Sequence, residues 1–380
     1  MRLFLVWRIY LRLGLEAQVP KPLGEWVDDN APLDPQIARL ARDVERLRQE
    51  RDAAKAAHRS AEKEIAAARE EVASLTALDR LSVESVPWKM PRGQKARKGA
   101  ATALVMLSDL HLDEVVKPEE VGGMNAYSRA IALQRLQRTA EGAVRLGTQL
   151  MSGFQYEGAI VILGGALVTG NLHDLAEFNE THSVIATVDY WVDHLATFLD
   201  TIAIAYGPTH VVSVVGNHGR LTRKPRTKGR VEDNFDHLLA RLLQRHYSAD
   251  KRFTWNIPLS ADAYCSVYDT RLLITHGDQA KGGAGISGLL TPISLLDHRK
   301  RKRDASLGTP YSHLFMGHWH QYLRTGTVTV GGSPKGLDEY AYLSNFGYEE
   351  PSSPFAIITP EHGVTIEAAI YSKDRKKEGW

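Results

Sequence analysis

Three patterns of hydrophobic and polar positions follow one another along the chain, and the first is a heptad repeat. Apolar or small residues recur every three or four positions from Ile37 to Leu75, with Arg, Glu, Lys and Ala between them and no Pro or Gly. This repeat predicts a coiled-coil helix over residues 36–82. Arg51 and His58 fall on its apolar seam, so the middle should pair weakly. A single solvated helix is the alternative; we favour pairing, in a homodimer or a higher oligomer.

Short segments of different composition flank this helix. Residues 1–35 start with an apolar stretch that three arginines interrupt and continue rich in Pro, Asp and Asn. They predict an amphipathic helix and a linker rather than a signal peptide, because the apolar part is short and no small-residue cleavage site follows. Residues 83–100 hold two prolines and five cations and predict a basic tether. Residues 373–380 predict a basic, frayed tail.

In residues 101–372, apolar runs first alternate with helical periodicity and then follow one another directly. The elements predicted for the first half are strand Ala101–Leu107, helix Asn125–Ser152, strand Ala159–Leu163, helix Asp174–Tyr206, strand His210–Val215 and helix Asn234–His246. The strands predicted for the second half are Ala263–Tyr268, Leu272–Thr275, His313–Met316, Thr325–Val330, Phe355–Thr359 and Val364–Ile370. Alternating elements early and strands late predict an α/β domain with two packed sheets and helices outside.

Composition limits the class of protein and its setting. A chain of 380 residues that is 43% hydrophobic can bury a large core, and a 24% charged fraction with a formal charge of +2 excludes wholesale disorder. The single cysteine, Cys265, cannot form an internal disulfide and has apolar neighbours, so we expect a buried thiol in a reducing, cytoplasmic setting. No apolar stretch reaches the ~18–20 residues needed to cross a bilayer, so no membrane span is expected.

Side chains that can bind a metal follow several of the predicted strands, in the strings S-D-L-H, V-G-N-H, T-H-G and G-H-W-H. Strand side chains alternate with period two, so an Asp-x-His or His-x-His pair lies on one face. Strand ends are also where α/β proteins place ligands, which predicts one shared pocket. Such nitrogen and oxygen donors suit Mn, Fe, Zn or Ni better than Mg or Ca. The side chains concerned are Asp109, His111, Asn217, His218, His276, His318 and His320.

The order of these motifs, D-x-H, G-G-x-L-V, G-N-H, H-G and G-H-x-H between Val105 and His320, resembles the calcineurin-like metallophosphoesterase superfamily. That superfamily includes Ser/Thr phosphatases, nucleotide phosphodiesterases and nucleases of the Mre11/SbcD type, and the variant here looks closest to phage or bacterial relatives. The resemblance implies an α/β four-layer sandwich, in which two mixed β-sheets are flanked by helices. It also implies two divalent metal ions at the strand ends, with Mn²⁺ foremost and Fe, Zn or Ni as alternatives.

The resemblance also implies a role for each motif residue. A metal-bound hydroxide would attack phosphorus, and the protein would hold both ions and protonate the leaving oxygen. The implied assignments are Asp109, His111 and His320 for the first ion, Asn217, His276 and His318 for the second, and His218 for contact with the phosphate and protonation of the leaving group.

Two positions depart from the family pattern. Where Val161–Gly170 has Ala166, the family places an aspartate that bridges both ions, and a methyl group cannot bind metal. Either the aspartate was replaced deliberately, or the chain is a natural non-catalytic member; we favour replacement, because a decaying site usually loses several ligands together. Low activity is expected either way. The second departure is Gly219, where many members carry an acid that orients the catalytic histidine; Asp278 or Asp174 could substitute.

Cations cluster beside the G-N-H motif. Six of them occupy residues 220–230, and five consecutive ones form a second block, Arg299–Arg303. We expect both blocks in loops, where they would favour a polyanion such as DNA or RNA; solvated faces are the alternative. Tyr311 and Trp319 could stack on a base, although core packing suits them better. The assignments from this pattern are Arg220 to catalysis beside His218, and Arg223, Lys224, Arg226 and His173 to substrate binding.

The sequence therefore predicts a dinuclear metal-dependent phosphoesterase, most simply a phosphodiesterase or nuclease that acts on nucleic acid and is inactivated by Ala166. A phosphomonoesterase for a nucleotide or a phosphoprotein is the first alternative, since it would use the same centre. A naturally non-catalytic coiled-coil interaction protein is the second.

Overall fold

The chain divides into two compact units, Met1–Ala73 and Ser74–Trp380. In the first unit every described residue is helical, as the heptad repeat predicts. The remainder of the predicted coiled coil, the N-terminal segment and the basic tether up to residue 98 lie outside the described residues, and pairing of the helix stays a prediction. No described helix is long and apolar enough to cross a bilayer. The computed structural model describes residues 43, 46–56, 58, 59, 62, 63, 99–170, 179–281 and 288–378.

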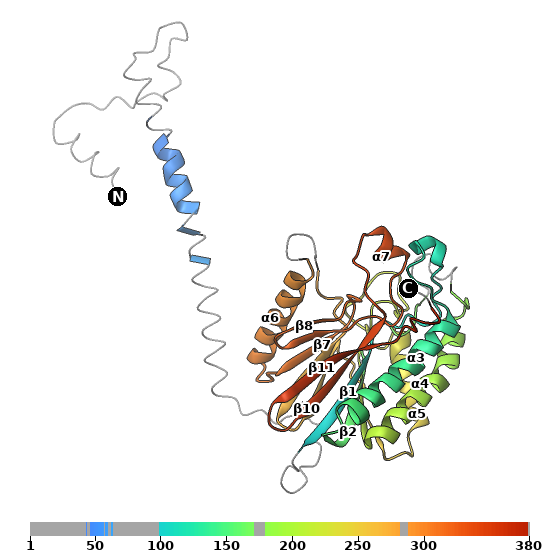
Figure 1. Cartoon of the computed structure of the whole chain (residues 1–380). Coiled ribbons are helices and arrows are strands. Elements are labelled where there is room, and N and C mark those ends of the chain that lie inside the picture. The colour runs from blue at the N-terminus through green and yellow to red at the C-terminus, as the bar shows by residue number, and fades with distance from the viewer. Residues whose placement is uncertain are drawn as a thin grey trace, which may run out of the picture. The chain divides into compact units, whose positions relative to one another are not determined.

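The second unit contains two β-sheets with helices on their outer faces (Figure 1). The strand order is β11-β10-β1-β2-β3-β4 in the first sheet and β5-β6-β7-β9-β8 in the second. The strands are β1 (Ala100–Leu107), β2 (Gln155–Leu163), β3 (Thr209–Ser213), β4 (Phe253–Asn256), β5 (Asp262–Val267), β6 (Thr270–Thr275), β7 (His313–Met316), β8 (Leu323–Thr325), β9 (Val328–Val330), β10 (Ser352–Thr359) and β11 (Gly363–Tyr371). The helices are η2 (Pro118–Val121), α3 (Arg129–Val144), its π-helical continuation η3 (Arg145–Leu150), α4 (Val184–Tyr206), α5 (Phe235–His246), α6 (Leu290–Ser306) and α7 (Glu339–Leu343).

Parallel pairing aligns the ends of the strands that carry the motifs. In the first sheet β1, β2 and β3 are parallel neighbours, with Val105 opposite Val161 and Val161 opposite Val211. In the second sheet β6 and β7 are parallel, with Thr275 opposite Met316. The carboxyl ends of neighbouring parallel strands share one edge of a sheet. Each metal-binding string directly follows one of these five strands, so the strings converge from both sheets.

Three layers of apolar packing confirm the four-layer sandwich that the sequence resemblance implies. Successive residues of β1 face opposite layers: Val105 packs toward α3, α4 and α5, whereas Met106 packs between the two sheets. Phe315 from β7 in the second sheet belongs to the same apolar layer as Met106. Leu314, its neighbour on β7, faces α6 together with Ile293. Period-two alternation in strands that are buried on both faces thus joins the four layers.

Two predicted helices begin later than their periodicity suggested. The helix expected from Asn125 begins after Ser128, whose hydroxyl accepts a hydrogen bond from the Ile131 amide, a standard N-cap. The helix expected from Asp174 begins after Ser183, because residues 179–183 are not helical. Residues 171–178, which include Asp174, lie outside the described part of the chain.

Helix α6 was not expected, and the basic block Arg299–Arg303 lies inside it rather than in a loop. The buried residues of α6 follow helical spacing but end with two charged ones, Lys300 and Asp304. Charged residues at buried positions hide the amphipathic pattern in the sequence, which explains why the helix was missed.

Ion pairs within the domain also occupy most of this basic block. Lys300 Nζ lies 2.6 Å from Asp262 Oδ1, and Arg303 Nη1 lies 2.6 Å from the other oxygen of the same carboxylate. Arg301 Nε lies 2.8 Å from Asp297. The expectation that this block lies in a loop is therefore wrong, and its contact with nucleic acid stays a prediction.

Smaller corrections concern short elements and the C-terminal tail. Strand β4 was missed, and the run Thr325–Val330 is part of a hairpin that turns at Gly326 with φ 51°. The tail is docked on α3 rather than frayed: Arg135 Nη2 lies 2.6 Å from Glu378, and Arg138 Nη1 lies 2.8 Å from Asp374. Cys265 is buried, as predicted.

Replacement of Phe315 by alanine tests the layer between the sheets. Phe315 is 0% exposed, so Phe315→Ala should lower the free energy of unfolding by about 3–5 kcal/mol. Phe346 is 50% exposed, and Phe346→Ala should change it by no more than about 0.5 kcal/mol. Urea denaturation measures both. Equal losses in the two variants would contradict the layer assignment.

Buried histidines predict a loss of stability in weak acid. Burial lowers the pKa of His210 in β3 and of His313 in β7 to about 4, below the value of about 6.5 in an unfolded chain. Between these values the unfolded chain binds more protons, so the free energy of unfolding should fall as pH drops from 6.5 to 4, by roughly 3 kcal/mol per histidine. Urea denaturation with EDTA across this range checks it. His210→Gln should make the fall shallower; an unchanged fall would exclude His210 as a source.

Candidate metal centre

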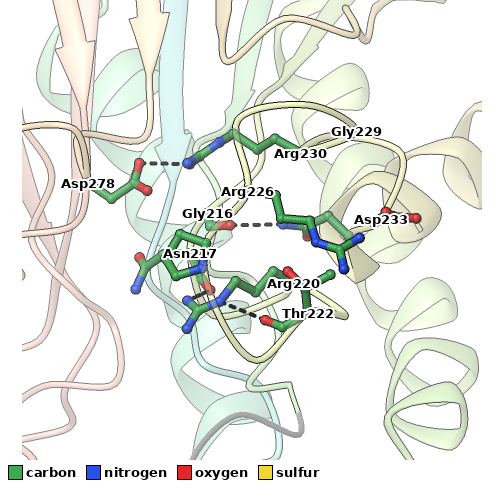
Figure 2. Close-up of a pocket in the computed structure, with 11 residues that line it drawn as sticks. Gly216, Asn217, Arg220, Thr222, Arg226, Gly229, Arg230, Asp233 and Asp278 are labelled. Carbon is green, nitrogen blue, oxygen red and sulfur yellow. Dashed lines mark hydrogen bonds and ion pairs between the residues drawn. The ribbon is translucent and has the colours of Figure 1, made fainter.

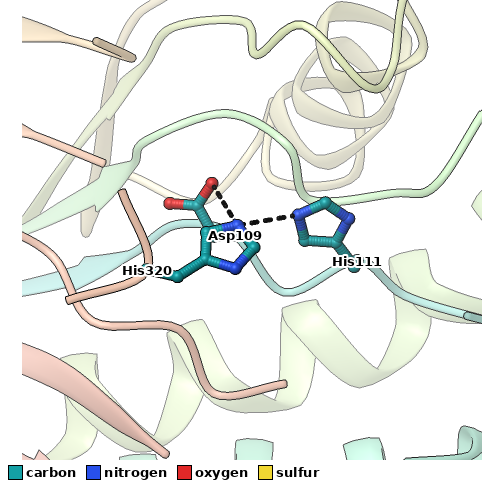
Figure 3. A group of neighbouring side chains, drawn as sticks. All are labelled: Asp109, His111 and His320. Carbon is teal, nitrogen blue, oxygen red and sulfur yellow. Dashed lines mark hydrogen bonds and ion pairs between the residues drawn. The ribbon is translucent and has the colours of Figure 1, made fainter. Parts of the chain in front are cut away.

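The three side chains predicted for the first metal ion lie together at the carboxyl ends of β1 and β7. Asp109 Oδ1 lies 3.4 Å from His320 Nε2, and His111 Nε2 lies 3.2 Å from the same nitrogen. One ligand atom from each of the three falls within 4.8 Å of the others (Figure 3). Residues 209 positions apart in the chain thus form a mixed carboxylate and imidazole cluster that could hold a divalent ion.

The three side chains predicted for the second ion form a neighbouring triplet. Asn217 Oδ1 lies 2.9 Å from His276 Nε2 and 3.2 Å from His318 Nδ1. The other ring nitrogen of His276, Nδ1, lies 2.9 Å from the carbonyl oxygen of Gly164 and therefore donates its proton there. In the neutral ring the lone pair is then on Nε2, the nitrogen that faces Asn217, and a neutral imidazole nitrogen is the form that metals bind.

Asp109 stands between the two triplets. Its Oδ1 is 3.9 Å from His276 Nε2, and its Oδ2 accepts a hydrogen bond of 2.9 Å from the His318 amide. Burial alone would raise the pKa of Asp109, but the neighbouring imidazoles, that of His320 first, outweigh it and hold the pKa below its usual range. Among the described residues Oδ1 has no hydrogen-bond partner. A buried anionic oxygen faced by imidazoles fits a bound cation.

The backbone at the ligand positions is held in the left-handed region, which few side chains adopt readily. The φ angles are 54° at Asp109, 46° at His111, 75° at His318 and 55° at His320. Asp and His tolerate this region better than most residues, and such conformations cluster at functional sites. Ala166 shares it with φ 49°, although alanine has no side chain that compensates there. The loops therefore aim specific side chains at the centre, and position 166 belongs to this set.

Behind His111 lies a buried ionic network that the sequence analysis missed. His111 Nδ1 is 3.1 Å from Glu114 Oε2, and Lys335 Nζ is 2.8 Å from Glu114 Oε1. Burial first, and then the charge of Lys335, lower the pKa of His111 to about 4, which keeps the imidazole neutral. A carboxylate that orients a metal-binding histidine is a common outer contact in metal sites. The spacing D-x-H-x-x-E was the available signal.

A second missed residue, Asp236 at the start of α5, fixes the loop that carries Asn217 and the loop that carries Ala166. Its buried carboxylate accepts hydrogen bonds from the amides of Ala166, Leu167 and Gly216, at 2.9, 3.0 and 2.9 Å. Asn234 Nδ2 adds a bond of 2.9 Å to the Gly216 carbonyl. One helix start thereby joins the loop after β2 to the loop after β3. No motif in the sequence indicated this role.

At both glycines of the G-N-H-G string, a side chain would clash with neighbouring atoms. A Cβ on Gly216 would lie 2.1 Å from the Ala166 amide nitrogen, so the two loops touch through their backbones. A Cβ on Gly219 would lie 2.5 Å from Asn234 Oδ1 and 3.0 Å from Asp236 Cγ. The side chains of α5 thus occupy the space that an acid at position 219 would need, which is a physical reason for this departure from the family pattern.

The residues predicted for catalysis lie beside the centre. The ring of His218 is 4.4 Å from that of His111, measured between centroids, and burial holds the pKa of His218 well below its ordinary value. Arg220 donates to the carbonyl of Asn217 at 2.6 Å and to that of Thr222 at 3.0 Å, so its guanidinium stabilises the loop. Asp278 pairs with an arginine of the same loop and is not shown to orient His218.

The residues predicted for substrate binding fall in two places. Arg223, Lys224 and Arg226 are exposed in the loop after β3, and their contact with substrate stays a prediction. His173 lies outside the described residues. Tyr311 is buried, as core packing predicts, and its hydroxyl lies 2.8 Å from Asp297 Oδ1.

No protein-family model matches the chain, and no curated protein matches it. Solved structures do match at low identity. A predicted phosphoesterase from Streptococcus pneumoniae TIGR4 is 10% identical and covers 71% of this chain and 98% of its own, with a TM-score of 0.26. Vps29 complexed with Zn²⁺, from Entamoeba histolytica, is 11% identical and covers 70% of this chain and 99% of its own, with a TM-score of 0.27. A dimetal phosphatase from Danio rerio is 11% identical and covers 72% of this chain and 99% of its own, with a TM-score of 0.27.

The chain's own residues, rather than these low TM-scores, carry the functional inference. Its motif order, its two-sheet architecture and its two converging triplets agree with one another. In all three respects the chain resembles a calcineurin-like metallophosphoesterase.

Substitution of Glu114 tests the outer contact of His111. Glu114→Gln keeps the size but removes the charge that orients the imidazole, and should weaken Mn²⁺ binding about 10–100-fold. The matched control is Glu120→Gln, an exposed acid in η2, which should bind Mn²⁺ as the parent does. Calorimetric titration measures both. A Glu114 variant that keeps the parental unfolding midpoint and the parental affinity would contradict the role.

Proposed function

We propose that this chain is a dinuclear metal-dependent phosphodiesterase that acts on nucleic acid and is kept weakly active by Ala166. The observation that carries the proposal is the convergence of six predicted ligands into two adjacent triplets at strand ends from both sheets. Two bound cations would neutralise a phosphodiester and lower the pKa of a water molecule. Mn²⁺ suits the mixture of imidazole, carboxamide and carboxylate donors.

His218 is the residue of the chain placed to handle the proton of the leaving oxygen. It lies against His111 and has no assigned place in either triplet. Its pKa is depressed by burial, so it is neutral at pH 7 without substrate. An anionic phosphate beside the ring would raise this pKa again, because opposite charge favours the protonated form. His218 then holds a proton where the leaving group needs one.

The loop after β3 supports nucleic acid as the substrate. Arg223, Lys224 and Arg226 are exposed there, in the same loop as Asn217. Clustered cations beside a phosphodiester centre attract a polyanion and release its counterions, which favours nucleic acid over a singly charged substrate. The block in α6 adds little, since ion pairs within the domain engage most of it.

Ala166 favours a second candidate, a natural non-catalytic protein that only binds. The backbone conformation at position 166 argues against this second candidate. Its φ of 49° is in the left-handed region, which aspartate adopts more readily than alanine. The retention of all six other ligands also favours an active ancestor with aspartate here.

Restoration of the carboxylate tests the enzyme proposal. Ala166→Asp with Mn²⁺ should hydrolyse bis(p-nitrophenyl) phosphate about 100-fold faster than the parent or more, the scale of one charged group in an active site. A lower rate on p-nitrophenyl phosphate would separate a diesterase from a monoesterase.

The control is Asp109→Asn in the same background, which should abolish the gain because it removes the carboxylate between the triplets. Failure of the restored protein to cleave either ester, while it binds Mn²⁺ and stays folded, would overturn the enzyme proposal and leave the binding protein.

A further inference from the structure

A pocket opens directly beside Asn217, a predicted metal ligand, and the cationic segment 220–230 of the same loop forms much of its wall (Figure 2). We propose that this pocket binds a second phosphate group of the substrate, the one next to the scissile phosphate along a nucleic-acid strand. The inference deepens the proposed function and rests on it. The lining residues that matter are Asn217, Arg220, Arg226, Arg230 and Asp278.

The walls of the pocket are tied to the ends of β3 and β6, two of the three strand ends that carry the second triplet. Arg230 Nη2 lies 2.7 Å from Asp278 Oδ1, and Asp278 follows the ligand His276 by two residues. On the other side Arg220 Nη1 donates to the Asn217 carbonyl at 2.6 Å. The loop between these two arginines is therefore fixed relative to the metal centre. A group bound in the pocket would lie at a set distance from the reacting phosphate.

The base of the loop is closed by backbone pairing, which leaves its middle to form the pocket rim. The Phe235 amide donates to the Gly219 carbonyl at 2.7 Å, and the Leu221 amide donates to the Asp233 carbonyl at 3.0 Å. Gly229 turns the chain back with φ 68°. A loop held at its base and at Asp278 can present a side chain at its middle at low cost in entropy.

Of the three arginines that line the pocket, two make polar contacts within the described part of the protein and one does not. Arg220 donates to backbone carbonyls, and Arg230 pairs with Asp278, so both are structural. Arg226 has no hydrogen-bond or ion-pair partner within residues 99–170, 179–281 and 288–378. It is the guanidinium left to meet a ligand, and a guanidinium binds phosphate through paired hydrogen bonds.

Electrostatics favours an anion here although two carboxylates, Asp233 and Asp278, also line the pocket. Asp278 is neutralised by Arg230, and three guanidinium groups, those of Arg220, Arg226 and Arg230, line the same pocket. Guanidinium groups crowded together repel one another, and a bound phosphate relieves this repulsion. A substrate with one phosphate would leave either this pocket or the metal centre without a phosphate, so the proposed pocket favours a strand with consecutive phosphates.

Binding to the unaltered full-length chain tests the proposal without turnover. The probe is a fluorescein-labelled oligothymidylate of eight nucleotides, followed by fluorescence anisotropy with EDTA. Arg226→Ala should weaken binding about tenfold, the effect of one lost charge-assisted contact. Lys228→Ala is the matched control: it removes one exposed cation from the same loop but outside the pocket lining, and should weaken binding less than about twofold.

A second probe separates phosphate recognition from other contacts. With the same oligomer carrying neutral methylphosphonate linkages, Arg226→Ala should have no effect. Equal losses for the Arg226 and Lys228 variants, an undiminished effect on the neutral probe, or no binding by the parent would each overturn the pocket. None of these outcomes depends on the hydrolysis assay with Ala166→Asp, so the pocket and the enzyme proposal can fail separately.

Discussion

The buried carboxylate of Asp236 holds together the loop that carries Asn217 and the loop that carries position 166. It satisfies amides from the loop after β2 and from the loop after β3, groups that would otherwise be buried without partners. Burial raises the pKa of Asp236, and the amide hydrogen bonds oppose this rise. An unmade buried hydrogen bond costs about 1–3 kcal/mol, so loss of this one side chain would release several at once. Asn217 and position 166 hold their places because a helix start, distant in the sequence, binds both loops.

The same principle applies on the other side of the centre, where Glu114 and Lys335 lie behind His111. Lys335 is 1% exposed and pairs with Glu114 and Asp338, so the network joins the first triplet to the start of α7. Buried ion pairs contribute little net stability, because desolvation offsets attraction. Their value here is in orientation: Glu114 fixes the ring of His111 and so determines which nitrogen faces the cation.

Sequence reasoning found what periodicity and local motifs can carry. Local motifs identified the pairs Asp109 with His111 and His318 with His320, and parallel pairing of the preceding strands brings them together. The expected strand alternation does not apply to them, because all four lie beyond the strand ends in left-handed backbone conformations. It could not find Asp236, because the role of that residue depends on loop contacts that no local pattern specifies, whereas Glu114 was overlooked although the spacing D-x-H-x-x-E pointed to it. It misjudged α6 for a related reason: Lys300 and Asp304 are buried through ion pairs, and buried charge looks like solvent-exposed charge in a sequence. His173 and most of the coiled coil lie outside the described residues and stay predictions.

The two triplets differ in charge, and this difference determines what Ala166 does. The first contains the carboxylate Asp109, whereas the second, Asn217 with His276 and His318, consists of neutral donors. A cation bound by neutral groups alone is poorly compensated in a buried site, so the second ion depends on charge supplied from outside its triplet. Asp109 is the nearest source, with an oxygen 3.9 Å from His276, but it already serves the first triplet. Without a carboxylate at position 166 a second ion would therefore bind more weakly than the first, and under the proposed function an anionic substrate would be the remaining group to offset its charge. In this chain, metal loading and substrate binding are expected to reinforce each other.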